Sequence, residues 1–290
     1  MHNKKHIFFL FSFMAIMLIF VGVFQSWNVA LTIFNLCLIS SIMSLGINIQ
    51  WGSAGIVNFG VMGFAALGGL ANIIIAMPPT DNAWEAGGIS IIFGMIVFIL
   101  SLIVTLVFWK KALLNNKIKY LISTIIIIIG YFLMRYLIDP SIENIEAIEP
   151  AKTGYLGGFN LPVLISWPVG GLLAALAAFI IGKISLGLRS DYLAIATLGI
   201  SEIIIYLLKN EDWLSRGVKN VNGLPRPVPY EIELQSKEWV IEIATTLNFS
   251  LPELSSIIVK LSYSFLFIIT LILIFYLLEV AVKSPWGRMM

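Results

Sequence analysis

Eight stretches of this chain are long and apolar enough to cross a lipid bilayer, and they limit the possible folds more than any other feature. A transmembrane helix needs roughly 20 mostly apolar residues to bridge about 30 Å of hydrocarbon. Backbone polar groups in lipid must pair within the protein, so the stretches predict helices and an all-α polytopic bundle. They are residues 7–24, 28–46, 53–77, 89–109, 120–138, 162–182, 191–208 and 255–280.

The composition agrees with lipid as the main solvent. Of the 290 residues, 59% are hydrophobic and only 12% are charged, whereas soluble domains carry about 25% charged residues. So few charges cannot cover the surface of a water-soluble globule. No basic stripe with interleaved aromatic residues is present, which argues against a nucleic acid partner.

The charges between the stretches sort by side. With the amino terminus inside, the inward ends and loops carry ten cations and almost no acids, and the short outward loops are acidic. Lysine and arginine concentrate on the cytoplasmic side of membrane proteins. We therefore expect an even number of spans with both termini in the cytoplasm. The ten cations are Lys4, Lys5, Lys110, Lys111, Lys117, Lys119, Lys183, Arg189, Lys283 and Arg288.

The third stretch differs in kind from its neighbours. From residue 52 to residue 69 the chain reads GSAGIVNFGVMGFAALGG, with six glycines and the polar Asn58. Small residues let helices approach closely, and glycine makes a helix easy to interrupt. We expect this stretch in the protein interior, as an interrupted or a re-entrant helix. The alternative is a tight helix contact with no role toward a substrate.

The seventh stretch is a second interior candidate. Asp191 is placed to cap its amino end, and Thr197 and Ser201 share one helix face. Glu202 lies near mid-depth, where a charge costs roughly 2.5–3.5 kcal/mol on insertion scales. An ionisable group at that depth is a functional candidate. The alternative is a neutral glutamic acid that holds a neighbouring helix by a hydrogen bond.

The outward segment 209–253 is the longest stretch outside the predicted spans. Its first half is rich in glycine and proline, which favours turns and extended chain. In its second half, Trp239, Ile243 and Leu247 recur every four residues. This spacing predicts a short amphipathic helix on the outer membrane surface.

The sequence lacks the residue patterns that would indicate a catalytic site. His2 and His6 lie in the leading tail, and no nucleotide-binding GxxxxGK[ST] loop or metal-ligand spacing occurs. We therefore predict no catalytic residues, no metal site, no cofactor and no enzyme activity. If transport is driven by ATP, a separate subunit must bind it.

Three strings in the chain resemble one family together. They are the glycine-rich segment 52–69, LRSDYLAIATLGISEIIIYLLKN at 188–210 and GVKNVNGLPRP at 217–227. They are similar to segments of the integral-membrane permeases of high-affinity branched-chain amino acid ABC importers, of the LivM type. In the third string, Lys219 and Asn220 depart from the family pattern. Related permeases carry urea or short amides, so the resemblance leaves the substrate open.

The resemblance implies a role and partners for the whole chain, 1–290, as a multi-pass permease domain of the bacterial inner (plasma) membrane. It implies alternating access driven by separate ATPase subunits, a second permease subunit and an extracytoplasmic substrate-binding protein. It also implies site residues, which are Gly55, Asn58, Thr197 and Glu202 for the translocation path, Arg216, Asn222 and Gly223 for docking of the binding protein, and Ser284, Pro285, Gly287 and Arg288 for coupling to the ATPase.

The last residues of the chain also resemble part of the family's sequence. SPWGR at 284–288 resembles the opening of the family's cytoplasmic coupling loop, after which further spans normally follow. Relative to the family, the chain is therefore expected to be incomplete at its carboxyl end, either as a fragment or as one part of a split protein.

Two other classes of function remain open on the residues alone. A secondary transporter or channel working alone would need a coupling-ion site, for which Glu202 is the candidate. A membrane scaffold or a non-transporting enzyme subunit is the third class. Co-purification with an ATPase subunit would separate the first class from the others.

Overall fold

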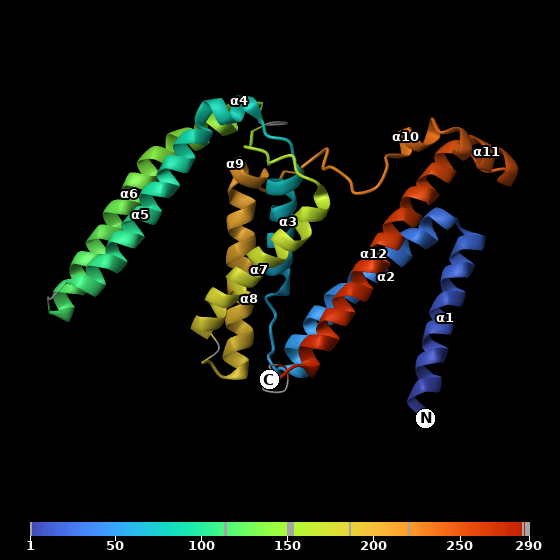
Figure 1. Ribbon diagram of the computed structural model, residues 1–290, viewed down its shortest axis with the longest axis horizontal. Coiled ribbons are helices and arrows are strands. Elements are labelled where there is room, and N and C mark those ends of the chain that lie inside the picture. Colours follow the sequence, from blue (N-terminus) through green and yellow to red (C-terminus); the bar gives the residue numbers. More distant parts are fainter. Residues whose placement is uncertain are drawn as a thin grey trace. The chain divides into compact units, whose positions relative to one another are not determined.

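The computed structural model describes residues 2–112, 115–149, 154–185, 187–219, 221–285 and 287, with side chains from residue 5 onward. Within these ranges every regular element is helical (Figure 1), and the only strand-like pairing is an isolated bridge between Pro79 and Gly157. The elements are α1 His2–Phe24, α2 Trp27–Ile47, the π-helix η1 Asn48–Ser53, α3 Val61–Ala76, α4 Asp81–Ala83, the π-helix η2 Trp84–Gly88, α5 Ile89–Lys111, α6 Asn116–Ala147, α7 Val163–Ser185, α8 Ser190–Asn210, α9 Asp212–Ser215, α10 Glu231–Gln235, α11 Glu238–Leu247 and α12 Leu251–Lys283.

The predicted polytopic helical bundle is confirmed. In the described part of the chain, seven helical segments are long and apolar enough to cross a membrane, and α3 is a shorter apolar helix. Within the third predicted span, 53–77, η1 ends at Ser53 and α3 begins only at Val61. The preceding residues 54–60 are not helical, so the expected interruption lies at the start of this span.

The chain divides into two compact units, which we describe separately. The first contains residues 1–61, 188–197 and 226–290, and the second contains residues 62–187 and 198–225, within the described ranges.

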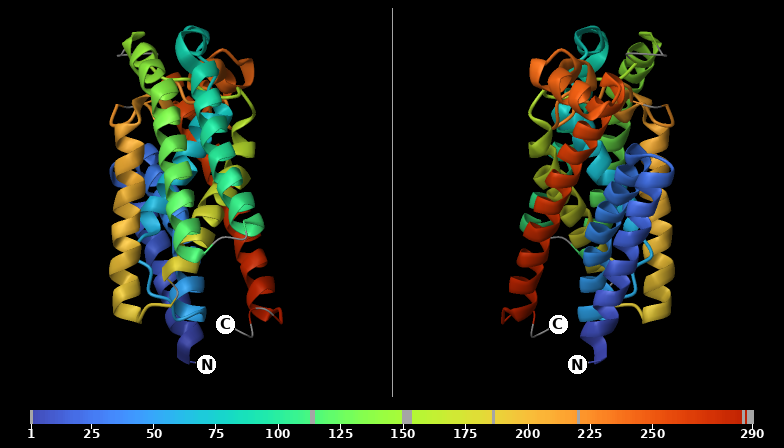
Figure 2. Two further views of the ribbon diagram at one scale, coloured as in Figure 1. Left: turned by 90° about the vertical axis from the view of Figure 1, so that its left-hand side faces the viewer. Right: turned by 90° about the vertical axis from the view of Figure 1, so that its right-hand side faces the viewer.

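In the first unit, polar groups join α2 and α12, which run side by side (Figure 2). The Asn35 side-chain amide donates to the Lys260 carbonyl at 3.0 Å, and the Ser264 hydroxyl donates to Asn35 Oδ1 at 2.7 Å. Lys260 Nζ donates to the Asn28 carbonyl at 2.9 Å. These contacts satisfy polar groups that lipid cannot.

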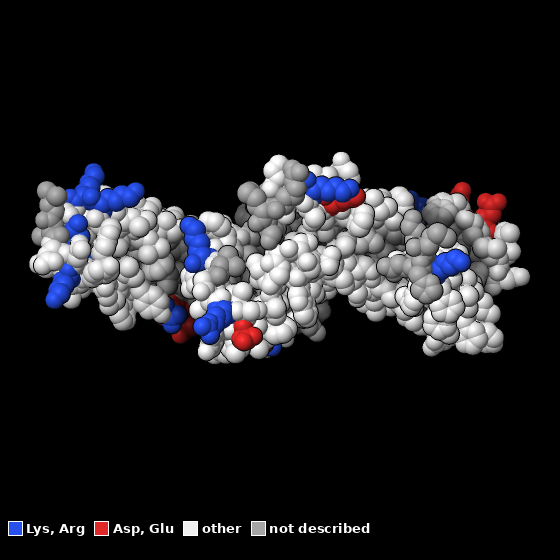
Figure 3. All heavy atoms as spheres, turned by 90° about the horizontal axis from the view of Figure 1, so that it is seen from below, with Lys and Arg blue, Asp and Glu red and all other residues white. Residues whose placement is uncertain are grey.

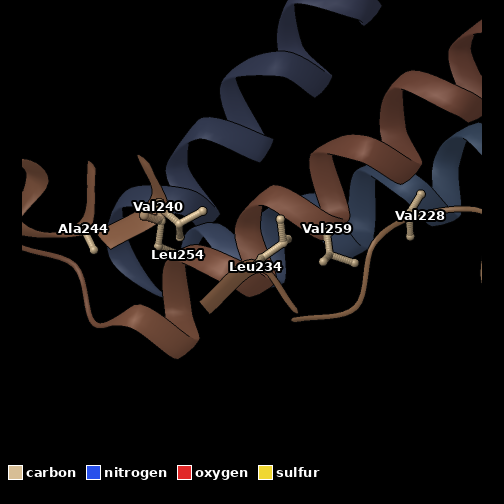
Figure 4. Packing of buried hydrophobic residues seen from close by; sticks show 6 residues of the cluster. All are labelled: Val228, Leu234, Val240, Ala244, Leu254 and Val259. Carbon is tan, nitrogen blue, oxygen red and sulfur yellow. The ribbon is translucent and has the colours of Figure 1, made fainter. Parts of the chain in front are cut away.

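The same unit has a small apolar core around the start of α12 (Figure 4). Val240 and Ala244 of α11 pack with Leu234 of α10 against Leu254 and Val259 of α12, with Val228 beside them. The Gln235 amide donates to Ser255 Oγ at 3.0 Å and ties α10 to the same part of α12. The core therefore fixes both short helices to one end of a membrane-length helix.

In the second unit, α5 and α6 form a close-packed hairpin. A Cβ on Gly94 would lie 2.5 Å from Ile138 Cγ1, so glycine is what permits this approach. Ile91, Ile138 and Ile145 lie in the core at the end where α4 and η2 precede α5. The other end of the hairpin carries Lys110, Lys111, Lys117 and Lys119, and it forms the blue group at the left of Figure 3.

The end of α3, also in the second unit, is held by extended chain. Phe159 N–H donates to the Ile74 carbonyl at 2.8 Å, Asn160 N–H to Met77 at 2.9 Å and Leu161 N–H to Ile75 at 2.8 Å. The last carbonyls of a helix have no partner within the helix. Here main-chain amides of residues 159–161 supply those partners.

Candidate functional site

The non-helical segment 54–60 separates η1 from α3 and is the most unusual feature of the predicted spans. Before it, Ala54 N–H donates to the Ile49 carbonyl at 3.0 Å and Ile56 N–H to the Gln50 carbonyl at 2.8 Å. Gly55 then has a φ of 65°, a conformation that favours glycine. Irregular backbone at membrane depth is tolerated where it is buried in protein or lines a cavity. Segment 54–60 is therefore the candidate site.

Asn58 holds this segment in shape. Its Oδ1 accepts a hydrogen bond from Gly60 N–H at 2.7 Å, and its Nδ2 donates to Gln50 Oε1 at 2.9 Å. Both ends of the Asn58 carboxamide are therefore engaged. The residue selected from the sequence lies at the centre of the local hydrogen bonds.

Thr197 of α8 meets the segment within the first unit. Phe59 N–H donates to Thr197 Oγ1 at 3.2 Å, and that hydroxyl donates to the Ala194 carbonyl at 2.9 Å. A Cβ on Gly60 would lie 2.5 Å from the Thr197 carbonyl oxygen. The structure therefore brings two predicted site residues, Asn58 and Thr197, to the same short stretch of backbone.

A second contact of the same kind lies within the second unit. Gly63 N–H, in the first turn of α3, donates to Ser201 Oγ at 2.8 Å. A Cβ on Gly63 would lie 2.8 Å from Ser201 Cα, and Ser201 is only 3% exposed. Ser201 is not among the site residues predicted from the sequence. Its position four residues after Thr197, on the same helix face, is the sequence signal that could have identified it.

Glu202 does not join this arrangement. At about 100° per residue it lies roughly 140° around α8 from Thr197, and its side chain is exposed. Its carboxylate forms no ion pair or hydrogen bond with any residue that the structure describes. In the same part of the chain, no three His, Cys, Asp or Glu side chains gather in a way that could hold a metal ion.

A cavity of about 200 Å³ opens beside the segment, within the first unit. Its walls are mainly apolar, and its polar side chains are two carboxamides. The sequence analysis selected Asn58 but missed Gln50, a polar residue that lies just after the end of the second predicted span, 28–46. The lining residues are Ile47, Gln50, Trp51, Ile56, Val57, Asn58, Phe59 and Val61.

The predicted coupling residues follow α12 directly. Ser284 N–H donates to the Ala281 carbonyl at 3.2 Å, and Ser284 Oγ accepts from Gly287 N–H at 3.2 Å. Pro285 lies within the turn between them. Arg288 lies outside the described residues. The turn fixes the direction in which the chain leaves the helix.

The predicted docking residues have different environments. Arg216 is only 6% exposed, has a φ of 61° and lies with its guanidinium carbon 5.9 Å from the centre of the Tyr155 ring. Burial raises the pKa of the Tyr155 hydroxyl, and the positive charge of Arg216 opposes that rise. Arg216 is therefore a buried residue of the loop, whereas Asn222 and Gly223 are exposed.

Comparison with known proteins finds a family that resembles the second half of the chain. Residues 151–290 match the family described as the permease component of branched-chain amino acid transport systems. Through this segment, the chain is similar to the branched-chain amino acid permeases. No solved structure matches the chain significantly.

Two curated relatives share a shorter stretch with this chain. Over 66 residues it is 42% identical to the high-affinity branched-chain amino acid transport system permease protein LivM of Escherichia coli strain K12. Over the same length it is 41% identical to the protein of that name from Salmonella typhimurium strain LT2. The matched stretch covers 23% of this chain and 16% of each relative.

Proposed function

We propose that the chain is a membrane permease subunit of an ABC importer for branched-chain or related amino acids. The observation that carries this proposal is the family match over residues 151–290, which include all of α8 and α12. The interrupted span at 54–60, outside that match, supports it independently. A helix break inside a membrane protein is a recurrent way to build a substrate path.

In this proposal, segment 54–60 is the moving part of the translocation path. Gly55 permits the bend, and Asn58 and Thr197 hold one of two conformations through the hydrogen bonds at Gly60 and Phe59. Breaking the Phe59–Thr197 bond would release the segment from α8. Alternating access then follows from a change in how this backbone pairs.

Glu202 has a separate role in the proposal. A carboxylate near mid-depth on an exposed helix face is costly against lipid. We place this face of α8 against a second permease subunit or a water-lined path. Replacement with Gln and then Leu tests the role. Unchanged uptake by both variants in a complete transporter would remove Glu202 from the path.

The partners follow from the permease family, whose members work with ATPase subunits and substrate-binding proteins. No nucleotide-binding loop occurs in this sequence, so we assign ATP to the partner ATPase and no cofactor to this chain. The ATPase docks at Ser284–Arg288 on the cytoplasmic side. The binding protein docks outside on the loop that contains Asn222 and Gly223. The amino terminus is cytoplasmic, in a bacterial inner membrane.

Transport by the complete complex tests the proposed function. The chain is reconstituted in proteoliposomes with its ATPase, second permease and binding protein, and uptake of labelled leucine, urea and acetamide is measured. We expect leucine uptake that requires ATP. Preferential uptake of urea or acetamide would assign a short-amide permease instead. Leucine uptake by the chain alone, driven by a proton gradient, would overturn the ABC mechanism in favour of a secondary transporter.

A further inference from the structure

The hydrogen bonds beside the cavity fix the orientation of two carboxamides. A main-chain N–H can only donate, so the Asn58 atom 2.7 Å from Gly60 N–H must be the oxygen. The nitrogen of Asn58 therefore faces Gln50. Since that nitrogen donates at 2.9 Å, the Gln50 atom that receives it must also be an oxygen. A single backbone amide thus sets the polarity of both side chains.

One pair of donors is left over at the end of this chain of bonds. With Gln50 Oε1 occupied by Asn58, the two N–H groups of Gln50 Nε2 face away from Asn58. Among the described residues, no hydrogen bond uses these donors, and Nε2 is not sealed from solvent. Gln50 lines the cavity of about 200 Å³.

The remaining walls of the cavity are apolar. Ile47, Ile56 and Val57 contribute aliphatic side chains, and Trp51 and Phe59 contribute aromatic rings. Small-molecule sites combine mostly apolar walls with a few placed polar groups. Donors without acceptors in such a cavity suit a ligand that presents a hydrogen-bond acceptor beside an aliphatic group.

We propose that Gln50 is a specificity-determining residue that binds the carboxylate of a small aliphatic amino acid in this cavity. The inference rests on the proposed transport function and adds where and how the permease itself contacts its cargo. The carboxylate accepts from Gln50 Nε2–H, and the aliphatic side chain lies against Ile47, Ile56 and Val57. Toward the carboxylate, Asn58 is a positioning residue, because it contacts Gln50 and holds it in this orientation.

Two substitutions replace the hydrogen-bond donors that face the cavity with acceptors, each in a different way. Gln50→Glu keeps an oxygen for Asn58 Nδ2 but turns an oxygen toward the cavity. Asn58→Asp keeps an acceptor for Gly60 N–H but removes the donor to Gln50, so that Gln50 rotates and offers its oxygen to the cavity. Both variants should reject a carboxylate and accept an amide that donates. Ser41→Ala serves as the matched control, since Ser41 does not line the cavity and bonds only to the Cys37 carbonyl of its own helix.

Binding is measured on the complete transporter in nanodiscs, without the binding protein, by displacement of tritiated leucine with unlabelled leucine or leucinamide. Because a hydrogen bond to a charged group is among the strong ones, the preference for leucine over leucinamide should fall at least about tenfold in both variants. The control should keep the wild-type preference. Thermal melting of each complex shows that it is folded.

The outcomes separate this inference from the proposed function. If the wild-type complex takes up leucine but shows no leucine binding in this assay, or if both variants keep the wild-type preference, the role of Gln50 is overturned. If the wild-type complex takes up no amino acid at all, the proposed function itself fails. A preference that changes in Gln50→Glu but not in Asn58→Asp would overturn the positioning role of Asn58.

Discussion

At the scale of single residues, glycine and small polar groups determine how closely backbones approach in this protein. Gly60 meets the main chain of Thr197, and Gly63 meets that of Ser201. In each case the nearest atoms belong to the backbone or to a short side chain, which cannot move aside as the end of a long side chain can. An added methyl group must therefore displace the chain itself.

The contact at Gly60 gives a direct prediction. Gly60→Ala would place Cβ 2.5 Å from the Thr197 carbonyl oxygen, so we expect a loss of about 1–3 kcal/mol, the usual cost of overpacking. Gly68→Ala, within α3, meets open space and should be neutral or stabilise by up to about 1 kcal/mol. Thermal unfolding of the purified chain in detergent measures both. Equal melting temperatures would contradict the contact.

The bond from Asn35 gives a second prediction at this scale. Asn35→Leu removes both the donor to Lys260 and the acceptor for Ser264. Hydrogen bonds between membrane helices are worth about 0.6–2 kcal/mol, so the melting temperature should fall. Ser41→Ala is the matched control on α2, because Ser41 bonds only to the Cys37 carbonyl of its own helix. A larger fall in melting temperature for Ser41→Ala than for Asn35→Leu would contradict a stabilising bond between α2 and α12.

At the scale of elements, α11 has two apolar faces with different surroundings. Val240 and Ala244 are buried against α12, whereas Trp239 is 48% exposed and Leu247 is 57% exposed. The helix α11 is fixed to residues near the start of α12. At 1.5 Å per residue, α12 is about 50 Å long. It therefore exceeds the hydrocarbon core, which is about 30 Å thick. We propose that α11 lies at the outer bilayer surface with its exposed row in lipid.

Spin labels test the depth of α11. In a Cys37→Ser background, a nitroxide at Ile243→Cys should collide more with oxygen, which concentrates in lipid, than with a water-soluble nickel complex. The same label at Glu242→Cys, one residue away on the polar side, should show the reverse preference. The measurement uses the full chain in phosphatidylcholine vesicles. Two labels that are equally open to the nickel complex would place α11 in water.

At the scale of the whole molecule, the side of the membrane that each loop faces decides where partners dock. The hairpin end with Lys110, Lys111, Lys117 and Lys119 should be cytoplasmic, because cations concentrate there. In sealed cells, a thiol reagent that cannot cross the membrane should leave Lys117→Cys unlabelled and should label Asn222→Cys. After permeabilisation both should react. Labelling of Lys117→Cys in sealed cells would reverse the predicted topology and both docking surfaces.

Much of the helical framework could be predicted because hydropathy and length report directly on a membrane environment. The interruption near Gly55 was foreseeable from the density of glycine, although the choice between an interrupted and a re-entrant helix was not. The length of α6 was not foreseeable in the same way. Its apolar stretch ended at residue 138, but the helix continues to Ala147, since charged residues outside lipid can extend a helix.

The candidate site was predictable only where a residue type is unusual for its place. Asn58 and Thr197 stand out as polar groups in apolar runs, and the structure joins both to the same segment. The role of Gln50 depends on a contact across a break in the helix, which no periodicity reports. The burial of Arg216 depends on a left-handed turn against Tyr155. Neither contact leaves a spacing that can be read from the chain.

The bonds that hold the end of α3 join main-chain atoms only, from Phe159, Asn160 and Leu161 to carbonyls at and just beyond the last turn of α3. Their strength depends little on the side chains at positions 159 and 161, proline excepted, because it lacks the N–H group. Asn160 has a φ of 54°, a conformation that favours glycine and asparagine. Deleting one residue there would shift every donor out of line with its acceptor. Most substitutions at Phe159 and Leu161 should therefore be tolerated, whereas insertions and deletions in this stretch should not.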